Sequence, residues 1–196
     1  VPPVLSGGVD ELFESLTLDR KRELSRVRRW LRSAGYRKRL EYMQQRLTGT
    51  AETLGTGVRS EQPVLQVASL EISKKFHKIG KLGNKIDSST SDEEVHDLRL
   101  ECKKLRYLLE FFGGLFAKKS LNKAVSVLKK LQDNLGPFND LSVQQESLER
   151  FLQDHQQQQS TLSAAVGGLI SALSREQREE RMRVTENFAL FYSPEN

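Results

Sequence analysis

The chain has 196 residues, with 31 Lys and Arg against 26 Asp and Glu and a hydrophobic share of 37%. That length fits one domain or a close pair, and the apolar share is enough for a core, which excludes a chain disordered throughout. The single cysteine, Cys102, excludes an internal disulfide and a cysteine-based zinc site, and it fits a reducing, cytoplasmic location. No apolar run approaches the roughly 20 residues of a membrane span, so we expect no membrane partner.

Nearly the whole sequence predicts α-helix. Long windows are rich in Leu, Glu, Lys, Arg and Gln, and neither an alternating strand pattern nor an Asn-Gly or Asp-Gly hairpin signal occurs. We therefore expect an all-α protein, an antiparallel helical bundle with long helices. In chain order, the expected helices cover residues 9–16, 18–32, 36–47, 64–86, 93–116 and 121–135, then a helix beginning near residue 139, and finally 161–192.

Glycine, proline and short polar residues set the expected boundaries. Gly35 interrupts the N-terminal helices, and the polar stretches 48–62 and 156–159 indicate loops or helix ends. The Ser, Thr and Asp residues of 87–92 suit an N-cap for the helix that follows. Gly136 and Pro137 are expected to end a helix, because Gly suits a C-cap and Pro cannot continue the helix. Asn139 or Asp140 would then cap the next one.

Charge is uneven along the chain. Residues 17–47 contain 11 Lys and Arg against 3 Asp and Glu, whereas residues 144–196 contain 5 against 8. The positive field therefore belongs to the first two-thirds of the chain and favours an anionic partner.

The helix expected over residues 93–116 has a narrow row of cationic groups. At ~100° per residue, the row falls within roughly 80° of the helix circumference, with Leu98, Leu105 and Leu109 on the opposite side. We call this row the cationic stripe; it consists of His96, Arg99, Lys103 and Arg106. Its like charges repel by about 0.2–0.5 kcal/mol per pair, and a polyanion along the stripe would relieve this. The alternative, a solvated face with local ion pairs, has equal weight on wheel geometry alone.

A second row of lysines lies upstream. Lys74, Lys78, Lys81 and Lys85 share one face of the helix expected over residues 64–86. Alone, this row suits a solvated face; beside the cationic stripe it would form the wall of a basic groove. Lys75 falls nearer the apolar sector, where it either extends to solvent or points into a polar cavity.

Three further lysines have different expected roles. On the helix expected over residues 121–135, Lys129 flanks the core face near Gln132, whereas Lys130 points away. Lys129 is therefore the better candidate for a ligand contact. Lys104 falls off the cationic stripe and is expected to be solvated.

These residues resemble a known family. The runs His96-Asp97-Leu98-Arg99 and Lys103-Lys104-Leu105-Arg106-Tyr107 resemble the signature helix of the CHAD family, the conserved histidine α-helical domain. Downstream, Leu128-Lys129-Lys130-Leu131-Gln132 and then Asn139-Asp140-Leu141 resemble the family's next helix and turn, in the same order. Upstream, Trp30-Leu31-Arg32-Ser33 with a following tyrosine and leucine resembles an earlier helix of the family.

The resemblance implies a helical bundle of two similar halves around a basic central cavity. It implies binding of inorganic polyphosphate, without catalysis and without a cofactor or metal, beside triphosphatase-type domains or at polyphosphate granules. Carried over to this sequence, the four residues of the cationic stripe would face the cavity, joined by Lys129. Our expected site adds Lys74, Lys78 and Lys81.

The chain departs from the family pattern in one respect. The family has two histidine-bearing helices, one per half, and this sequence has one, because His77 and His155 lie in no such context. Residues 1–16 therefore resemble the connector or tail of a preceding half, and residues 17–192 the second repeat. A preceding half or a homodimer would complete the cavity.

Other functions compete for the same residues. His96-Asp97 is similar to the metal-binding pair of helical phosphohydrolases, but helix neighbours diverge by ~100° and no further His-rich set converges with them, so we expect no enzyme. RNA binding is the closest alternative, since it also needs a phosphate chain, but only Tyr107 offers a stacking ring near the stripe. A helical interaction scaffold is the third hypothesis. Without the resemblance, His96 is better explained as a core histidine.

Overall fold

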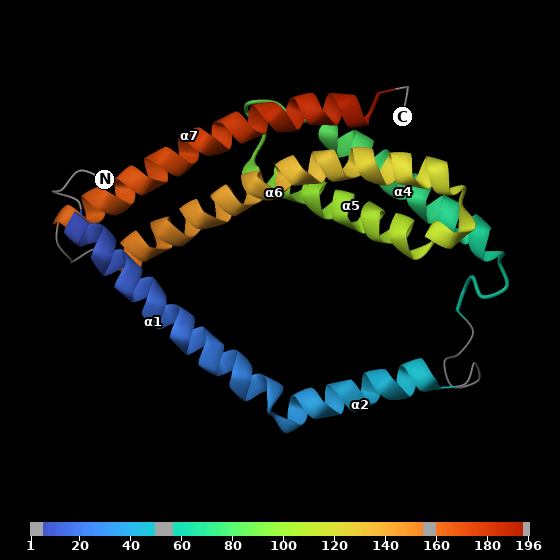
Figure 1. Ribbon diagram of the computed structural model, residues 1–196, viewed down its shortest axis with the longest axis horizontal. Coiled ribbons are helices and arrows are strands. Elements are labelled where there is room, and N and C mark those ends of the chain that lie inside the picture. Colours follow the sequence, from blue (N-terminus) through green and yellow to red (C-terminus); the bar gives the residue numbers. More distant parts are fainter. Residues whose placement is uncertain (1–5, 50–56, 155–159, 194–196) are drawn as a thin grey trace. The chain divides into compact units, whose positions relative to one another are not determined.

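The computed structural model describes residues 6–49, 57–154 and 160–193, and these contain no β-strand (Figure 1). The all-α fold class is therefore confirmed. His155, the polar run at 156–159 and the middle of the loop expected at 48–62 lie outside the described residues. The elements are α1 (Ser6–Leu31), α2 (Ala34–Thr48), α4 (Val64–Gly83), α5 (Asp92–Phe111), the 3₁₀ helix η2 (Gly113–Leu115), α6 (Lys118–Asp154) and α7 (Ser160–Phe191).

The chain divides into two compact units. Unit 1 comprises residues 1–62 and 157–166, and unit 2 comprises residues 63–156 and 167–196. The first residues of α7 thus belong to unit 1 and the rest to unit 2. The predicted division into a connector at 1–16 and a domain at 17–192 stays a prediction.

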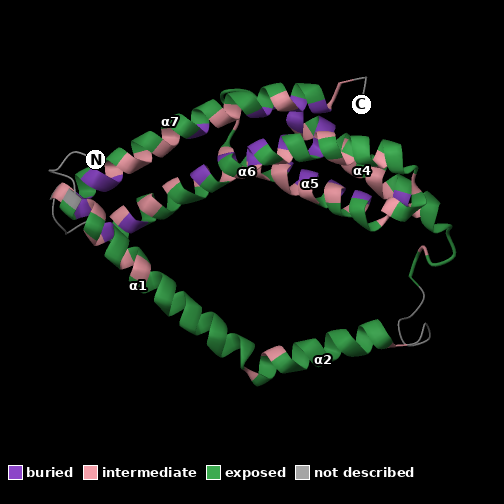
Figure 2. Ribbon diagram, in the orientation of Figure 1, coloured by how far each residue is buried: buried purple, intermediate pink, exposed green. Residues whose placement is uncertain are grey.

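In unit 1, α1 is one continuous helix, so the break predicted between residues 16 and 18 is wrong. Thr17 costs an α-helix at most about 0.7 kcal/mol, too little to end it. The next boundary lies at Ser33, whose hydroxyl accepts a hydrogen bond from the Tyr36 amide at 3.1 Å, and Gly35 lies inside the first turn of α2. Figure 2 shows exposed residues along nearly all of α2, which has no buried residue.

In unit 2, α4, α5, α6 and the C-terminal part of α7 enclose the main hydrophobic core. Two glycines of α4 allow α7 to come close: a Cβ at Gly83 would overlap the Phe188 ring, and one at Gly80 the Tyr192 ring. The core consists of Ile79, Ile86, Val95, Leu98, Cys102, Leu105, Leu109, Leu128, Leu131, Leu135, Phe138, Val184, Phe188 and Phe191.

The boundaries of α5 follow its sequence. Ser91 and Glu94 form a capping box, in which the Ser91 hydroxyl accepts from the Glu94 amide and the Glu94 carboxylate accepts from the Ser91 amide. The predicted cap within residues 87–92 is therefore confirmed. The helix ends at Phe111, five residues before the predicted end, because Gly113 and Gly114 have poor helix propensity and the chain tightens into η2.

α6 runs through Gly136 and Pro137 without ending, so the predicted stop there and the predicted cap at Asn139 or Asp140 are wrong. A proline inside a helix costs about 3 kcal/mol, but burial of one Leu or Phe side chain contributes about 1.5–3 kcal/mol. α6 buries such side chains on both sides of the proline: Leu131, Leu135, Phe138 and Leu141. Asp133, whose carbonyl loses its helical partner, is exposed like Pro137, so water reaches that side of the helix.

α7 begins and ends within one residue of its predicted range. Among the described helices, none has the length and apolar content needed to cross a lipid bilayer.

Candidate functional site

The cationic stripe lies along the edge where α5 meets α6. Val95, Leu98 and Leu105 of α5 are almost fully buried, and this fixes the rotation of the helix about its axis. With the apolar side in the core, all four stripe residues are partly exposed. Two of them, His96 and Arg106, contact α6 through hydrogen bonds.

His96 lies at the N-terminal end of the stripe. Its Nδ1 is hydrogen-bonded to Oδ1 of Asn139 on α6. An amide oxygen can only accept, so Nδ1 is the donor and the proton of a neutral His96 ring lies on that nitrogen. Nε2 of that neutral ring carries the lone pair and is an acceptor. Asn139 was predicted as a helix cap, and it lies instead inside α6.

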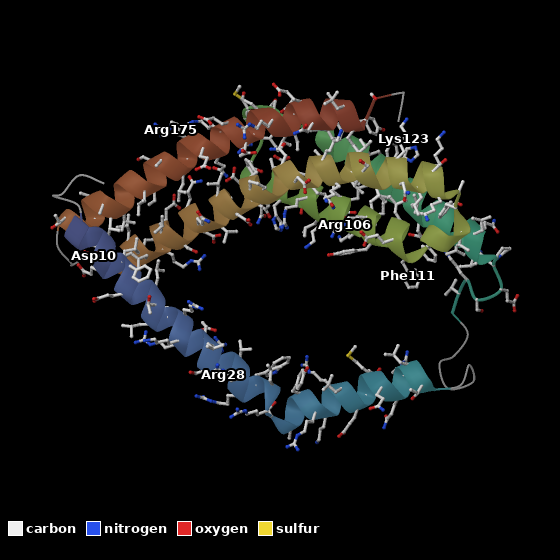
Figure 3. The ribbon with its side chains drawn as sticks, viewed as in Figure 1. Asp10, Arg28, Arg106, Phe111, Lys123 and Arg175 are labelled. Carbon is white, nitrogen blue, oxygen red and sulfur yellow. The ribbon has the colours of Figure 1, made fainter. Side chains whose placement is uncertain are left out.

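Arg106 lies at the other end of the stripe (Figure 3). Its Nη1 donates to Oε1 of Gln132 on α6 at 3.1 Å, and its guanidinium lies 5.4 Å from the centre of the Tyr107 ring. Its Nε is 3.3 Å from a carboxylate oxygen of Glu110, close enough for an ion pair but not aligned for a hydrogen bond. Arg106 Nε and Gln132 Nε2 are both buried donors without a hydrogen-bond acceptor in the described part of the chain.

Within the part of the chain that the structure describes, the middle of the stripe has no anionic partner. Arg99 and Lys103 are half-buried, and neither makes a hydrogen bond or an ion pair with its side chain among residues 6–49, 57–154 and 160–193. Cations in such positions are more often paired. These two side chains therefore remain available to an anion from outside the chain.

The opposite flank of α5 holds a different arrangement, centred on Glu101. This carboxylate is almost fully buried and accepts hydrogen bonds from Lys75 at 2.7 Å, Lys78 at 3.0 Å and Lys104 at 2.9 Å. Burial raises the pKa of Glu101, but the three lysines outweigh that effect and lower the pKa to about 2. Glu101 thus ties α4 to α5, and Lys104, predicted to be solvated, is one of its partners.

The α4 lysines and the stripe therefore do not line one groove. Glu101 and the stripe are separated by ~180° around α5, and Lys78 is bound on the Glu101 side. Lys74 pairs with Glu71 at 3.4 Å. Lys74, Lys78 and Lys81 instead border a separate hollow of about 340 Å³ with Ser73 and His77. His77 is hydrogen-bonded through Nδ1 to the Ser73 carbonyl oxygen at 2.7 Å, within its own helix.

Lys129 and Lys130 are both exposed on α6. Lys129 lies three residues before Gln132 and so one turn along the same side of the helix, whereas Lys130 is directed away. The choice of Lys129 over Lys130 stays a prediction.

Three polar contacts were not predicted from the sequence: those of Gln132 and Asn139 at the stripe, and that of Glu101 on the other flank of α5. A signal existed for Glu101, which falls three residues after Leu98 and next to Cys102 in the apolar sector of α5, where an unpaired charge would be costly. Burial also raises the pKa of the Cys102 thiol to about 12, helped by the Glu101 charge.

In the described residues, no three His, Cys, Asp or Glu side chains gather where they could hold a metal ion.

Comparison with known proteins gives one family. The sequence model described as the CHAD domain matches residues 2–149, well over half of the chain. The match spans α5 and most of α6, and so includes the cationic stripe with Gln132 and Asn139. The search of curated proteins found no match.

Proposed function

The chain belongs to the CHAD family, and from that membership we propose that it binds inorganic polyphosphate along the cationic stripe of α5. CHAD domains are known in general to bind polyphosphate. The proposal for this chain adds the site, the absence of a catalytic step, and a location in the cytoplasm or at polyphosphate granules. A triphosphatase-type domain and a second copy of the chain are the proposed protein partners.

The observation that carries the proposal is the unpaired centre of the stripe. Arg99 and Lys103 are half-buried cations without an anion in the described structure. A phosphate chain has repeated negative oxygens, so it can satisfy both at once, and it reduces the repulsion between neighbouring cations. Arginine adds paired hydrogen bonds to phosphate oxygens.

The test is a titration of long-chain polyphosphate against the wild type and an Arg99→Ala/Lys103→Ala variant. Neither side chain makes a polar contact in the described structure, so the fold should be kept. Affinity should fall about 10²- to 10⁴-fold, because two charged hydrogen bonds of about 1.5–3 kcal/mol each are lost. Affinity of the wild type should also fall steeply with salt, because bound phosphates release counterions.

The matched control is Lys119→Ala/Lys130→Ala, which removes the same charge from exposed positions on α6 away from the stripe. It should change affinity less than threefold. Equal losses in the two double variants would mean that only net charge matters and would contradict a site at the stripe.

RNA is the second candidate, and one observation favours it. Tyr107 is half-exposed beside Arg106, so a base could stack on its ring next to the stripe. Competition between polyphosphate and an RNA with the same number of phosphates separates the two. Polyphosphate should displace the RNA. Tighter binding of RNA would mean that the stripe is an RNA-binding site.

A further inference from the structure

α6 contacts the cationic stripe through two neutral amide side chains. Gln132 accepts from Arg106, and Asn139 accepts from His96, at the two ends of the stripe. The two amides are seven residues apart, which is close to two helical turns, so they lie on the same side of α6. Both ends of the stripe are therefore held by one face of the neighbouring helix.

We infer that Gln132 and Asn139 are positioning residues, which orient Arg106 and His96 without neutralising them, and that Gln132 also donates to the ligand through Nε2. The inference rests on the proposed function, since it concerns the same site, and its ligand is a chain of phosphates. No role at this site follows from the family match for either amide.

The two flanks of α5 show why an amide differs from a carboxylate. On one flank, the Glu101 carboxylate draws three lysines into a closed cluster whose charge is partly cancelled. On the other flank, an amide oxygen fixes the direction of a cation but adds no negative charge. Gln132 thus cancels none of the charge of Arg106, whose ion-pair partner is the half-exposed Glu110. The Arg106 side chain is already ordered before binding, which lowers the entropy cost of binding.

The buried donors at the Arg106–Gln132 pair point to an acceptor from outside. Gln132 Oε1 is occupied by Arg106, which fixes the orientation of the whole amide and leaves Nε2 buried with no acceptor in the described structure. Arg106 Nε is also buried without a hydrogen-bond acceptor, but a carboxylate oxygen of Glu110 lies 3.3 Å away on that side. Buried donors are rarely left unpaired, and these two belong to side chains already hydrogen-bonded to each other. A phosphate oxygen is an acceptor of the right chemistry for Gln132 Nε2, and its binding requires a side-chain movement that exposes this buried donor.

The experiment uses Gln132→Glu and Asn139→Asp, each measured for polyphosphate affinity. Both changes keep the size and the accepting oxygen, and each adds one negative charge, beside Arg106 or beside the His96 ring. Gln132→Glu also removes the Nε2 donor. We expect each to weaken binding at least tenfold. Gln144→Glu is the matched control, because it makes the same change at an exposed position of the same helix, and it should stay within twofold of the wild type.

A second measurement is independent of the variants' stability. In ¹⁵N-resolved NMR spectra of the wild type, the side-chain NH₂ signals of Gln132 should shift when polyphosphate is added, whereas those of Gln144 should not. An amide with a purely structural role would not respond. Unmoved Gln132 signals in a protein whose α5 backbone signals do shift would overturn the inference.

The outcomes separate the two proposals. If the wild type does not bind polyphosphate, the proposed function fails. If the wild type binds, and Gln132→Glu and Asn139→Asp bind as tightly as Gln144→Glu, the proposed function stands and the positioning role is refuted.

Discussion

Glu101 and Gln132 face opposite flanks of α5 and hold cations in different ways. Glu101 accepts from three lysines and is itself almost fully buried, so it acts as a structural bridge between α4 and α5. Gln132 accepts from one arginine and adds no negative charge, and the ion-pair partner of that arginine is the half-exposed Glu110. Removing a buried carboxylate from its partners leaves the remaining charges without compensation, which is strongly destabilising.

Replacement of Glu101 by Gln should therefore lower the free energy of unfolding at pH 7 by about 2 kcal/mol, less than the full value for a buried pair because Lys78 and Lys104 are half-exposed. Urea unfolding measures it. The control is Glu110→Gln, which breaks a half-exposed pair with Arg106 and should cost about 0.5 kcal/mol or less. Equal losses in the two variants would contradict the bridging role.

The same bridge has a defined pH dependence. The folded-state pKa of Glu101 is lowered to about 2, so its contribution is fully present above its ordinary pKa near 4.5 and is lost as the pH falls toward 2. The stability difference between the wild type and Glu101→Gln should therefore shrink between pH 4.5 and pH 2. A difference that stays constant over this range would show that the ionised carboxylate is not what stabilises the fold.

Side-chain partners were the least predictable part of the site. The helical-wheel projection of residues 93–116 placed the cationic stripe and the apolar side of α5 correctly. Burial of Leu98 and Leu105 fixes the rotation of the helix about its axis. It gave no information on which helix lies against each flank, so the Glu101 cluster and the Gln132 and Asn139 contacts were missed. Those contacts depend on the packing of α4 and α6, which no single-helix pattern contains.

Helix boundaries were predicted correctly where a strong local sequence signal set the boundary. They were predicted wrongly where burial of apolar side chains was worth more than the local signal. The N-cap predicted within residues 87–92 is confirmed at Ser91, because a short polar side chain can accept from the free amides at the start of α5. The stop predicted at Pro137 failed because burial of the neighbouring side chains of α6 is worth more than the lost hydrogen bond. Helices with a proline on the solvent side can continue when their apolar side is buried.

Replacement of Pro137 by Ala should stabilise the protein. Alanine restores the amide that can bond the Asp133 carbonyl, and an internal proline costs about 3 kcal/mol, partly offset by about 0.4–1 kcal/mol because proline also restricts the unfolded chain. We expect a gain of about 2 kcal/mol in urea unfolding. Gly168→Ala, at an exposed helical position of α7 with open space around the Cβ, gives a reference gain of about 0.5–1 kcal/mol. A loss of stability in Pro137→Ala would mean that α6 needs the proline's geometry.

At the scale of the whole chain, the two units differ in how their helices are stabilised. In unit 2, α5 buries six residues and is held by the capping box and the Glu101 cluster. In unit 1, α2 has 15 residues and buries none of them. An isolated helix of about 12–15 residues is marginally stable in water, since most helix stability in proteins comes from packing of an apolar face.

Hydrogen exchange should therefore separate α2 from α5. The backbone amides of Ala34–Thr48 should exchange within seconds at neutral pH, whereas those of residues 98–109 should be protected by orders of magnitude, because their opening requires disruption of the unit 2 core. Polyphosphate should add protection around the stripe and leave α2 unchanged.

Protection of α2 equal to that of α5 would contradict the expectation. It would mean that the apolar row of α2, Leu40, Met43 and Leu47, is covered in solution. Repeating the measurement at two protein concentrations then identifies the cover: protection that rises with concentration comes from a second copy, and protection independent of concentration comes from the same chain.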